Sequence, residues 1–312
     1  MTTQNPTAFK SALIVVNPKS GHGDSGIDAF IGYLRDAGVR VEVRETTADS
    51  TPEEDVKGLE GFDALIGAGG DGTVSSLAYA ARSYQKAYLP YPAGTANLIA
   101  QNLDLPTDPR ALADLFLSGR TETLDMAELE VNNKVHGFAM LAGMGLDAAM
   151  IRDSEENKGR LGAVAYVASA LKQLHPQHAH FKLTLDGREV EVEGMGVMVA
   201  NFGMANYRVP ITGDVSPADG KLTVIVLKGT SIANLIPTLF GSLRAKLHLG
   251  SADLGDSLET FEATEVSVQA SQALPAEYDG ETIEGDVMFL KARVLPGAVQ
   301  YVTPAPLTDL ST

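Results

Sequence analysis

Gly-Gly-Asp-Gly-Thr at residues 69–73 follows the apolar run Ala-Leu-Ile at 64–66 and precedes the small-residue segment 74–81. This order predicts a strand, a glycine-dense turn and a helix. The first N–H groups of such a helix have no partner within the helix and point toward one spot, which suits a phosphate. Glycine lets the backbone approach a ligand closely and adopt positive φ. The stretch therefore predicts a nucleotide or phosphate site rather than a plain turn.

Strand-like runs and helical patterns alternate on both sides of this loop. The runs lie at 12–16, 39–43 and around 88–90. Helices are predicted by apolar spacing over 27–34, by a capping box at 51–54 and by Asp-Pro at 108–109. Four alternations in about 110 residues are typical of an open parallel sheet wound with helices.

Polar residues follow successive strands of this predicted sheet. Asn17, Thr47, Asp71 and Thr95 each come just after a strand. Ligands of such sheets bind beyond the carboxyl ends of the strands, so we expect all four residues to converge on one crevice. The loop 17–23 is by itself either a strand-to-helix connection or a second phosphate or ribose loop.

The alternation of strands and helices ends after Gly119. Hairpins are predicted over 124–142, with an Asn-Asn turn, and over 181–193, with an Asp-Gly turn. Two helices, 162–174 and 231–249, interrupt a series of further strands, at 195–200, 222–227, 265–269, 287–294 and 299–302. We therefore expect a nucleotide-binding α/β domain over 1–120 and a mainly antiparallel β-sandwich domain over 121–312. The sequence leaves open whether the last strand returns to the first domain.

Composition restricts the class of protein. A chain of 312 residues with 44% hydrophobic and 21% charged residues is typical of a soluble protein with two domains. Without cysteine, nothing depends on disulfides or thiolates, and a cytoplasmic setting is expected. The net charge of −16 argues against nucleic acid as a partner and against permanent residence on an anionic membrane. The sequence does not indicate the oligomeric state, and a homodimer is one option.

The chain resembles the diacylglycerol kinase catalytic family, which includes bacterial soluble lipid kinases and, more distantly, sphingosine and ceramide kinases. The resemblance implies an NAD kinase-like α/β domain followed by a β-sandwich. It also implies transfer of the γ-phosphate of ATP, with Mg²⁺, to the primary hydroxyl of a membrane lipid. Six landmarks carry it, in the family's order: Asn17-Pro18-Lys19-Ser20-Gly21, Gly69 to Thr73, Gly94-Thr95-Ala96-Asn97, Gly143 to Ala148, Asp219-Gly220 and Asp279-Gly280-Glu281.

The resemblance also implies roles for particular residues. Either Asp279 or Glu281, reaching in from the β domain, accepts the proton of the lipid hydroxyl. Asp71 holds the magnesium or orients the hydroxyl. A structural magnesium is bound by Asp219 and by the carbonyls of Ser216 and Lys221. The implied nucleotide contacts are Asn17, Thr47, Gly69, Gly70, Asp71, Gly72, Thr73, Val74, Ser75, Gly94, Thr95 and Asn97.

Two departures from the family's pattern lie near Asp71. Ser76 stands where relatives often have Glu, and Leu98 and Gln101 stand where many have Asp and Arg. Loss of both charges removes an ion pair without leaving either charge buried alone, so we expect a different local network rather than an inactive enzyme.

Other functions remain open from the sequence. NAD kinases share the Gly-Gly-Asp-Gly loop, although the Asn-Pro-x-Ser-Gly opening and the late Asp-Gly-Glu favour a lipid kinase. A non-catalytic lipid or nucleotide sensor would explain Ser76 and Leu98. Among lipids, diacylglycerol is expected first, and ceramide, sphingoid bases and monoacylglycerol stay open. Asp279-Gly280 and Asp219-Gly220 by themselves also suit ordinary turns.

An acidic protein needs local positive charge to approach an anionic membrane. The stretches 158–160 and 244–248 are basic, and 242–250 contains no acidic residue. They predict weak, reversible, salt-sensitive docking at the inner face of the membrane; the alternative is that they are ordinary solvated side chains at helix ends.

Overall fold

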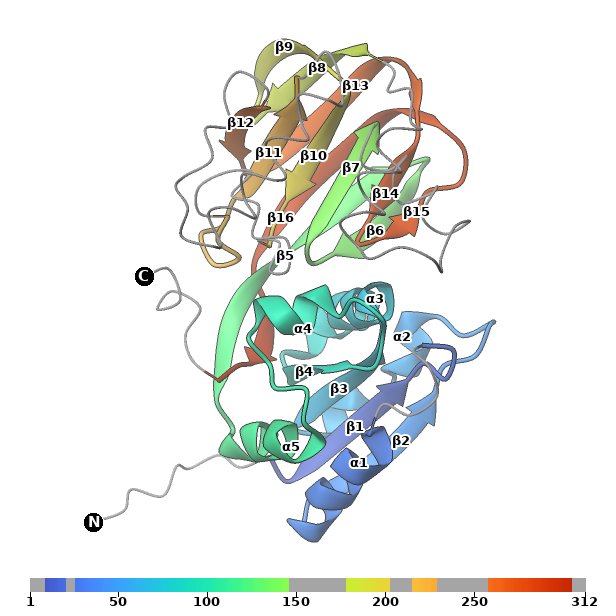
Figure 1. The fold of residues 1–312 in the computed structure, drawn as a ribbon, viewed down its shortest axis with the longest axis vertical. Helices are drawn as coiled ribbons and strands as arrows, with labels where there is room; N and C mark the ends of the chain where they lie inside the picture. Colours follow the sequence, from blue (N-terminus) through green and yellow to red (C-terminus); the bar gives the residue numbers. More distant parts are fainter. Residues whose placement is uncertain (1–8, 21–25, 146–177, 203–214, 229–257, 305–312) are drawn as a thin grey trace, which may run out of the picture. The chain divides into compact units, whose positions relative to one another are not determined.

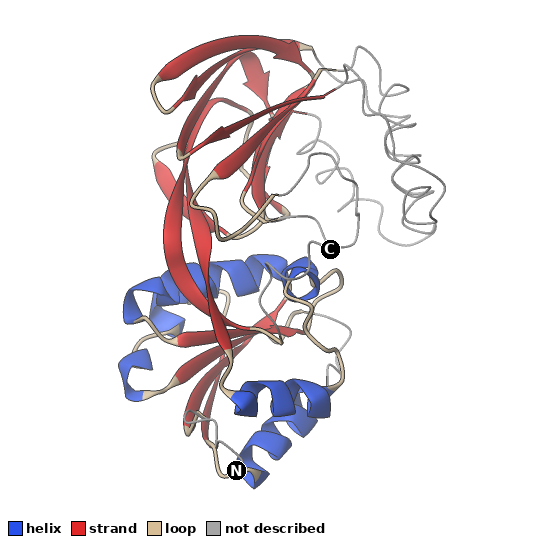
Figure 2. Cartoon of the chain, turned by 90° about the vertical axis from the view of Figure 1, so that its left-hand side faces the viewer, coloured by secondary structure: helices blue, strands red, loops and turns tan. Residues whose placement is uncertain are grey.

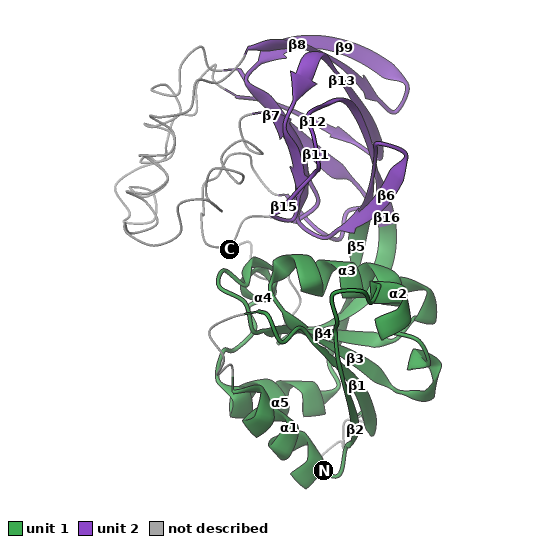
Figure 3. Cartoon of the chain, turned by 90° about the vertical axis from the view of Figure 1, so that its right-hand side faces the viewer, with its two compact units in different colours: residues 1–126, 296–312 green, residues 127–295 purple. Residues whose placement is uncertain are grey.

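A computed structural model describes residues 9–20, 26–145, 178–202, 215–228 and 258–304. The chain divides into two compact units, 1–126 with 296–312, and 127–295 (Figure 3). The division thus falls beyond Arg120, inside a strand, and the end of the chain returns to the first unit. The two helices predicted at 162–174 and 231–249 lie outside the described residues, as do both basic stretches. No helix of the described ranges is long and apolar enough to cross a membrane.

The first unit is a parallel sheet with strand order β2-β1-β3-β4. Figures 1 and 2 show α1 and α5 on one face of this sheet and α2 and α3 on the other. The predicted α/β architecture is confirmed. Its elements are β1 (Ser11–Val16), α1 (Ile27–Asp36), β2 (Arg40–Glu45), α2 (Pro52–Asp55), η1 (Leu59–Gly61), β3 (Ala64–Gly69), α3 (Asp71–Ala81), η2 (Arg82–Tyr84), β4 (Ala87–Pro92), α4 (Leu98–Asn102) and α5 (Pro109–Ser118).

Burial explains the short apolar strands of this unit. Every residue of β3 is buried, as are the first five of β1 and of β4, because helices cover both faces of the sheet. The predicted helix caps are present. Thr51 and Glu54 form a capping box, and the Asp108 side chain accepts the N–H of Ala111.

The second unit is mainly antiparallel β, as predicted. A six-stranded sheet has the order β12-β11-β10-β7-β14-β15, and the other strands run β16-β13-β8-β9, with β5 beside β16 and β6 beside β5. Buried residues of both sheets form one apolar cluster. The strands are β5 (Thr121–Val131), β6 (Lys134–Phe138), β7 (Leu141–Gly145), β8 (Ala179–Leu185), β9 (Arg188–Gly194), β10 (Gly196–Ala200), β11 (Leu222–Leu227), β12 (Leu258–Ala263), β13 (Glu265–Leu274), β14 (Ala276–Tyr278), β15 (Glu281–Thr282) and β16 (Val287–Val302).

The end of the chain differs from the sequence-based prediction. The two strands predicted at 287–294 and 299–302 are one strand, β16. Gly297 adopts φ 59° within it, and its N–H donates to Asp125 Oδ1 at 2.8 Å, which allows a local bend without a break. Gln300 and Tyr301 of β16 then pair with Ala87 and Tyr88 of β4 in the first unit.

Candidate functional site

Three loops at the carboxyl ends of β1, β3 and β4 contact one another in the first unit. Asn17 Nδ2, just after β1, donates to Thr73 Oγ1 at 2.9 Å. The Gly70 N–H, just after β3, donates to Ser20 Oγ at 3.2 Å. We call residues 17–20, 69–73 and 94–97 the loop cluster. The convergence predicted for Asn17 and Asp71 is therefore present, and Ser20 is a member that the predicted contacts did not include.

Two glycines of the loop cluster are required by close approach of the backbone. A Cβ on Gly94 would lie 2.5 Å from Gly70 Cα, and a Cβ on Gly69 would lie 2.7 Å from Thr73 Cβ. Gly70 is the N-cap of α3 and no side chain caps this helix. The backbones of Gly70 and Gly94 therefore meet at the start of α3, and the first N–H groups of a helix are suited to binding a phosphate.

Asp71 and Asn97 hold the loop cluster together. Asp71 Oδ1 accepts the N–H of Ile99 at 2.9 Å, which ties the start of α3 to α4. Asn97 adopts φ 52°, and its side chain closes the 94–97 loop through both polar atoms of the Gly94 backbone, at 2.7 and 2.9 Å. One oxygen of Asp71 is thus committed to the fold, and the Asn97 amide is committed to its own loop.

Other predicted nucleotide contacts are placed differently. Thr47 is exposed and forms a small turn with Ser50, whose N–H donates to Thr47 Oγ1 at 3.1 Å. Val74 is 4% exposed, and its N–H donates to the Gly70 carbonyl. Ser75 is also buried, whereas Thr95 is exposed in the loop cluster.

The departures from the family's pattern form neutral local contacts. Ser76 Oγ donates to the Thr73 carbonyl at 3.0 Å, and Gln101 Nε2 donates to the Ala96 carbonyl at 2.6 Å. Both side chains satisfy backbone carbonyls at the two helix starts of the loop cluster. This is the different local network that the sequence predicts.

In the second unit, Asp279 and Gly280 form the two-residue turn between β14 and β15. Both adopt positive φ, 46° and 84°, as in a type I′ hairpin turn. Asp279 is 7% exposed, and its carboxylate accepts three backbone N–H groups, from Ala139 at 2.7 Å, Met140 at 2.9 Å and Leu141 at 3.0 Å. Its own N–H donates to the Leu141 carbonyl at 2.9 Å. This carboxylate therefore fixes the turn to the 139–141 segment.

Glu281 has a different environment from Asp279. It is exposed, and it pairs with Tyr278 across the hairpin. The pKa of Tyr278 is raised by burial, then by the negative charges of Glu281 and Asp279. The His136 ring stacks on Tyr278 with 4.6 Å between centroids, and its pKa is lowered by burial, then by the charge of Lys134.

Two buried polar side chains beside this turn have no counterpart in the predicted site. Asn201 is fully buried and its Nδ2 donates to the Ala139 carbonyl at 2.9 Å. Glu277 is fully buried on β14 and its Oε2 accepts the Gly280 N–H at 3.0 Å. The only sequence signal for Glu277 is a carboxylate inside a short strand that is otherwise apolar.

The predicted metal ligands lie in the loop that leads into β11. Asp219 is exposed and its Oδ1 accepts the Lys221 N–H at 2.9 Å, while Lys221 Nζ contacts Glu262 Oε2 at 2.7 Å. Among the described residues, no group of three or more His, Asp or Glu side chains is placed to hold a metal. A metal here would use one carboxylate, the Ser216 and Lys221 carbonyls and water, a donor set that suits Mg²⁺.

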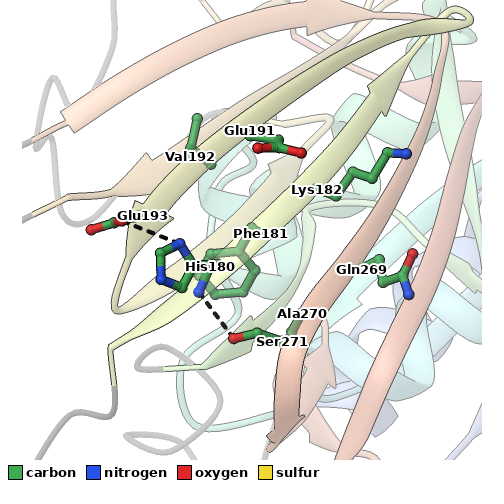
Figure 4. A pocket seen from close by; sticks show the side chains of 9 residues that line it. All are labelled: His180, Phe181, Lys182, Glu191, Val192, Glu193, Gln269, Ala270 and Ser271. Carbon is green, nitrogen blue, oxygen red and sulfur yellow. Dashed lines mark hydrogen bonds and ion pairs between the residues drawn. The ribbon is translucent and has the colours of Figure 1, made fainter.

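A separate hollow of about 630 Å³ lies on the second unit (Figure 4). Its lining comes from β8, β9 and β13 and contains none of the predicted site residues. His180 lies on β8 and pairs with Glu193 at 3.2 Å, where both side chains are about three-quarters exposed, at 76% and 74%. His180 and Glu193 are therefore solvated side chains on two of the strands that line the hollow.

Two family models cover most of the chain. Residues 11–129 match the diacylglycerol kinase catalytic domain, and residues 141–303 match the YegS C-terminal NAD kinase beta sandwich-like domain. A diacylglycerol kinase of Mycobacterium tuberculosis (strain CDC 1551) is 26% identical over 93% of this chain and 94% of its own length. A protein of Pseudomonas aeruginosa named "Probable lipid kinase YegS-like" is 29% identical over 94% of each chain.

A solved structure shares the fold. The crystal structure of a diacylglycerol kinase from Bacillus anthracis superposes with a TM-score of 0.73 and 22% identity, over 97% of this chain and 99% of that chain. The order of the two matched domains is the order of the two units described above. The chain therefore belongs to the family of diacylglycerol kinase and YegS lipid kinases.

Proposed function

We propose that the protein uses ATP and Mg²⁺ to phosphorylate the primary hydroxyl of a membrane lipid, with diacylglycerol as the first candidate. The observation that carries the proposal is the loop cluster, where the uncapped start of α3 meets the Gly70–Gly94 contact. The similarity to a relative named diacylglycerol kinase, over 93% of this chain, supports the choice of lipid.

The loop cluster would hold the phosphates of ATP through backbone N–H groups. ATP supplies the phosphoryl group, and Mg²⁺ neutralises charge that develops during transfer. Gly69, Gly70, Gly72 and Gly94 leave the space free of side chains. Asn17 keeps Thr73 in place. Asp71 joins α3 to α4 through one carboxylate oxygen, and its other oxygen would serve a metal or a hydroxyl.

Glu281 is the better candidate for the base that accepts the proton of the lipid hydroxyl. A carboxylate has about four acceptor positions, and Asp279 already accepts three N–H groups in a buried turn. Glu281 is exposed at the start of β15 and follows that fixed turn directly. Asp279 thus acts as an anchor, and Glu281 as the group that meets the substrate.

The exposed carboxylate of Asp219 would bind a structural Mg²⁺ together with the Ser216 and Lys221 carbonyls. Because Asp219 lies in the loop before β11, the proposed role of this ion is to stabilise the second unit. The ion needs no part in the phosphoryl transfer itself.

The test of the function is substrate choice. Purified protein is assayed with labelled ATP and mixed micelles of diacylglycerol, monoacylglycerol, ceramide or sphingosine, and separately with NAD. We expect Mg²⁺-dependent transfer to diacylglycerol above the other lipids. Transfer to another lipid would change the substrate, transfer to NAD would favour the NAD kinase-like alternative, and nucleotide or lipid binding without turnover would favour a sensor.

The test of the base compares two exposed carboxylates of the same region. Glu281→Gln is expected to lower kcat by about 100- to 10,000-fold with little change in the KM for ATP. Glu284→Gln is the matched control, because Glu284 is exposed three residues later and has no proposed role. Equal kcat values for Glu281→Gln and wild type would reject Glu281 as the base.

Contact with the membrane is proposed to be peripheral and reversible, at the cytoplasmic face. The net charge of −16 makes that contact dependent on local basic residues and on salt. Vesicle sedimentation with neutral and anionic lipids at two salt concentrations tests this. Vesicle binding that changes with neither the lipid charge nor the salt concentration would reject this mode of membrane contact.

A further inference from the structure

We infer that Glu277 is a positioning residue that holds the Asp279–Gly280 turn, and with it Glu281, through the Gly280 N–H. The inference rests on the proposed role of Glu281 as the base. It concerns a buried carboxylate that none of the roles above uses.

Glu277 and Glu281 lie on opposite faces of the hairpin. Glu277 and Tyr278 are neighbours on β14, so their side chains leave opposite faces of the strand. Tyr278 packs against the apolar cluster between the two sheets, on the face that it shares with its cross-strand partner Glu281. Glu277 therefore lies on the other face of the six-stranded sheet, fully buried.

From that face, Glu277 reaches around the turn. Its Oε2 accepts the Gly280 N–H at 3.0 Å, whereas Asp279 uses its carboxylate on Ala139, Met140 and Leu141. Gly280 is the residue that directly precedes Glu281. The peptide unit between Asp279 and Gly280 is thus held by both carboxylates, and its orientation sets where the chain enters β15.

The bond to Gly280 accounts for the burial of the Glu277 carboxylate. A fully buried carboxylate is expensive to keep in an apolar strand unless it forms a specific hydrogen bond. The N–H that it binds belongs to the turn and not to the strand ladder. Reactive groups lose rate when they shift by about an ångström, up to about 100-fold, so a hydrogen bond that orients the turn is expected to affect kcat.

The first test uses three substitutions at one position. Glu277→Gln keeps an oxygen that accepts the Gly280 N–H, whereas Glu277→Leu and Glu277→Ala remove it. We expect Glu277→Leu to lower kcat about 10- to 100-fold with an unchanged KM for ATP, and Glu277→Gln to restore most of that loss. Thr282→Ala is the control, because Thr282 pairs with Glu277 across the hairpin and is exposed. Wild-type kcat in Glu277→Leu would overturn the inference.

The second test separates positioning from a general loss of structure. In a Glu281→Gln background, Glu277→Leu is expected to cost no further activity, because a residue that acts through the base has no effect once the base is absent. An additional loss of the same size would overturn the inference and indicate a merely structural role.

A third measurement does not depend on activity or on the identity of the base. Hydrogen exchange at the Gly280 amide is expected to be slow in wild type and in Glu277→Gln, and fast in Glu277→Leu. If Glu281→Gln turns out to be fully active while this exchange pattern holds, the proposed base is wrong and the Glu277 contact is right. Fast exchange in wild type would overturn the contact itself. If Glu277→Leu does not fold, the comparison of Glu277→Gln with Thr282→Ala decides: an unprotected Gly280 amide in Glu277→Gln would reject the inference.

Discussion

Asn17 Nδ2 donates to Thr73 Oγ1 at 2.9 Å, so the loop after β1 is bonded to the first turn of α3. The two residues are 56 positions apart in the sequence, and each follows a different strand of the parallel sheet. This contact joins two of the three loops of the loop cluster. It also gives the proposed nucleotide site its most direct structural test.

The Asn17–Thr73 contact is expected to support both the stability of the first unit and its binding of ATP. Asn17→Ala and Thr73→Val each remove one partner, and each is expected to lower the free energy of unfolding by about 0.5–1.5 kcal/mol and to raise the KM for ATP. In the double variant, the two losses are expected to be less than additive. Urea unfolding and ATP titration measure both effects; strict additivity would show that the contact does not operate in solution.

The close approach of Gly94 to Gly70 predicts intolerance of any side chain. Gly94→Ala would place a Cβ 2.5 Å from Gly70 Cα, so the backbone of one loop must move. We expect the KM for ATP to rise about tenfold or more because the phosphate surface is displaced. Gly32→Ala is the control, since a Cβ there meets no atom within 4 Å. The two variants are compared by kinetics and by thermal unfolding, and equal behaviour would contradict the prediction.

Asp279 is expected to matter more for stability than Glu281. In Asp279→Asn, one of the two acceptor oxygens becomes an NH2 group, which cannot accept an N–H, so at least one buried donor among Ala139, Met140 and Leu141 loses its partner. Such a loss costs about 1–3 kcal/mol, whereas the exposed Glu281→Gln is expected to change the free energy of unfolding by less than about 0.5 kcal/mol. Chemical unfolding of both variants checks this order, and the reverse order would refute the anchor role.

Mg²⁺ is expected to stabilise the second unit through Asp219. For one site, a free Mg²⁺ concentration a hundredfold above the Kd adds about 2.7 kcal/mol of stability. We expect a saturable rise in Tm for wild type and for Glu262→Gln, whose carboxylate contacts the Lys221 side chain rather than the proposed ion. Asp219→Asn is expected to abolish the rise. A wild-type response in Asp219→Asn would exclude this loop as the metal site.

His136 is expected to make stability depend on pH below 6.5. Its pKa in the folded protein is lowered from 6.5 by burial and then by Lys134, so the folded state favours the neutral ring. The unfolded chain takes up the proton first as the pH falls from 6.5 toward the folded pKa, and stability is lost across that window. His136→Phe keeps an aromatic ring against Tyr278 and is expected to reduce this loss. Unfolding at pH 7.5 and 5.5 measures it; an equal pH dependence in the two proteins would contradict the prediction.

The sequence predicted the parallel sheet of the first unit because its signals are local. Each strand is a short apolar run, and each cap or glycine stands next to the element that it ends, as Thr51 and Asp108 show. The hairpin turn 132–133 was also predictable, because two asparagines at positive φ suit a type I′ turn. The proximity of the loops that hold Asn17 and Asp71 was predictable from their positions after successive strands, whereas Gly94 was named only through the resemblance to the family.

What the sequence did not predict depends on side-chain contacts that no short sequence pattern encodes. The strands β14 and β15 have three and two residues, too few for any periodic pattern. Asn201 and Glu277 resemble ordinary polar residues until the fold brings them to Ala139 and Gly280. The contact of Thr47 with the nucleotide stays a prediction, and the bond of Thr47 to the nearby Ser50 was not predicted. The choice between Asp279 and Glu281 likewise required the three N–H groups of the 139–141 segment.

The path of β16 determines which truncated forms of the chain keep the first unit intact. The second unit is an insertion whose two ends are the neighbouring strands β5 and β16, so the first unit is not encoded by one uninterrupted segment. A fragment that ends at residue 126 would lose the strand that pairs with β4, together with Tyr301, which is fully buried and meets the Tyr88 ring edge to face with 5.6 Å between centroids. The bare edge of β4 would favour aggregation. Excision of 127–295 with a short linker between β5 and the end of β16 is therefore the truncation that preserves the nucleotide-binding sheet.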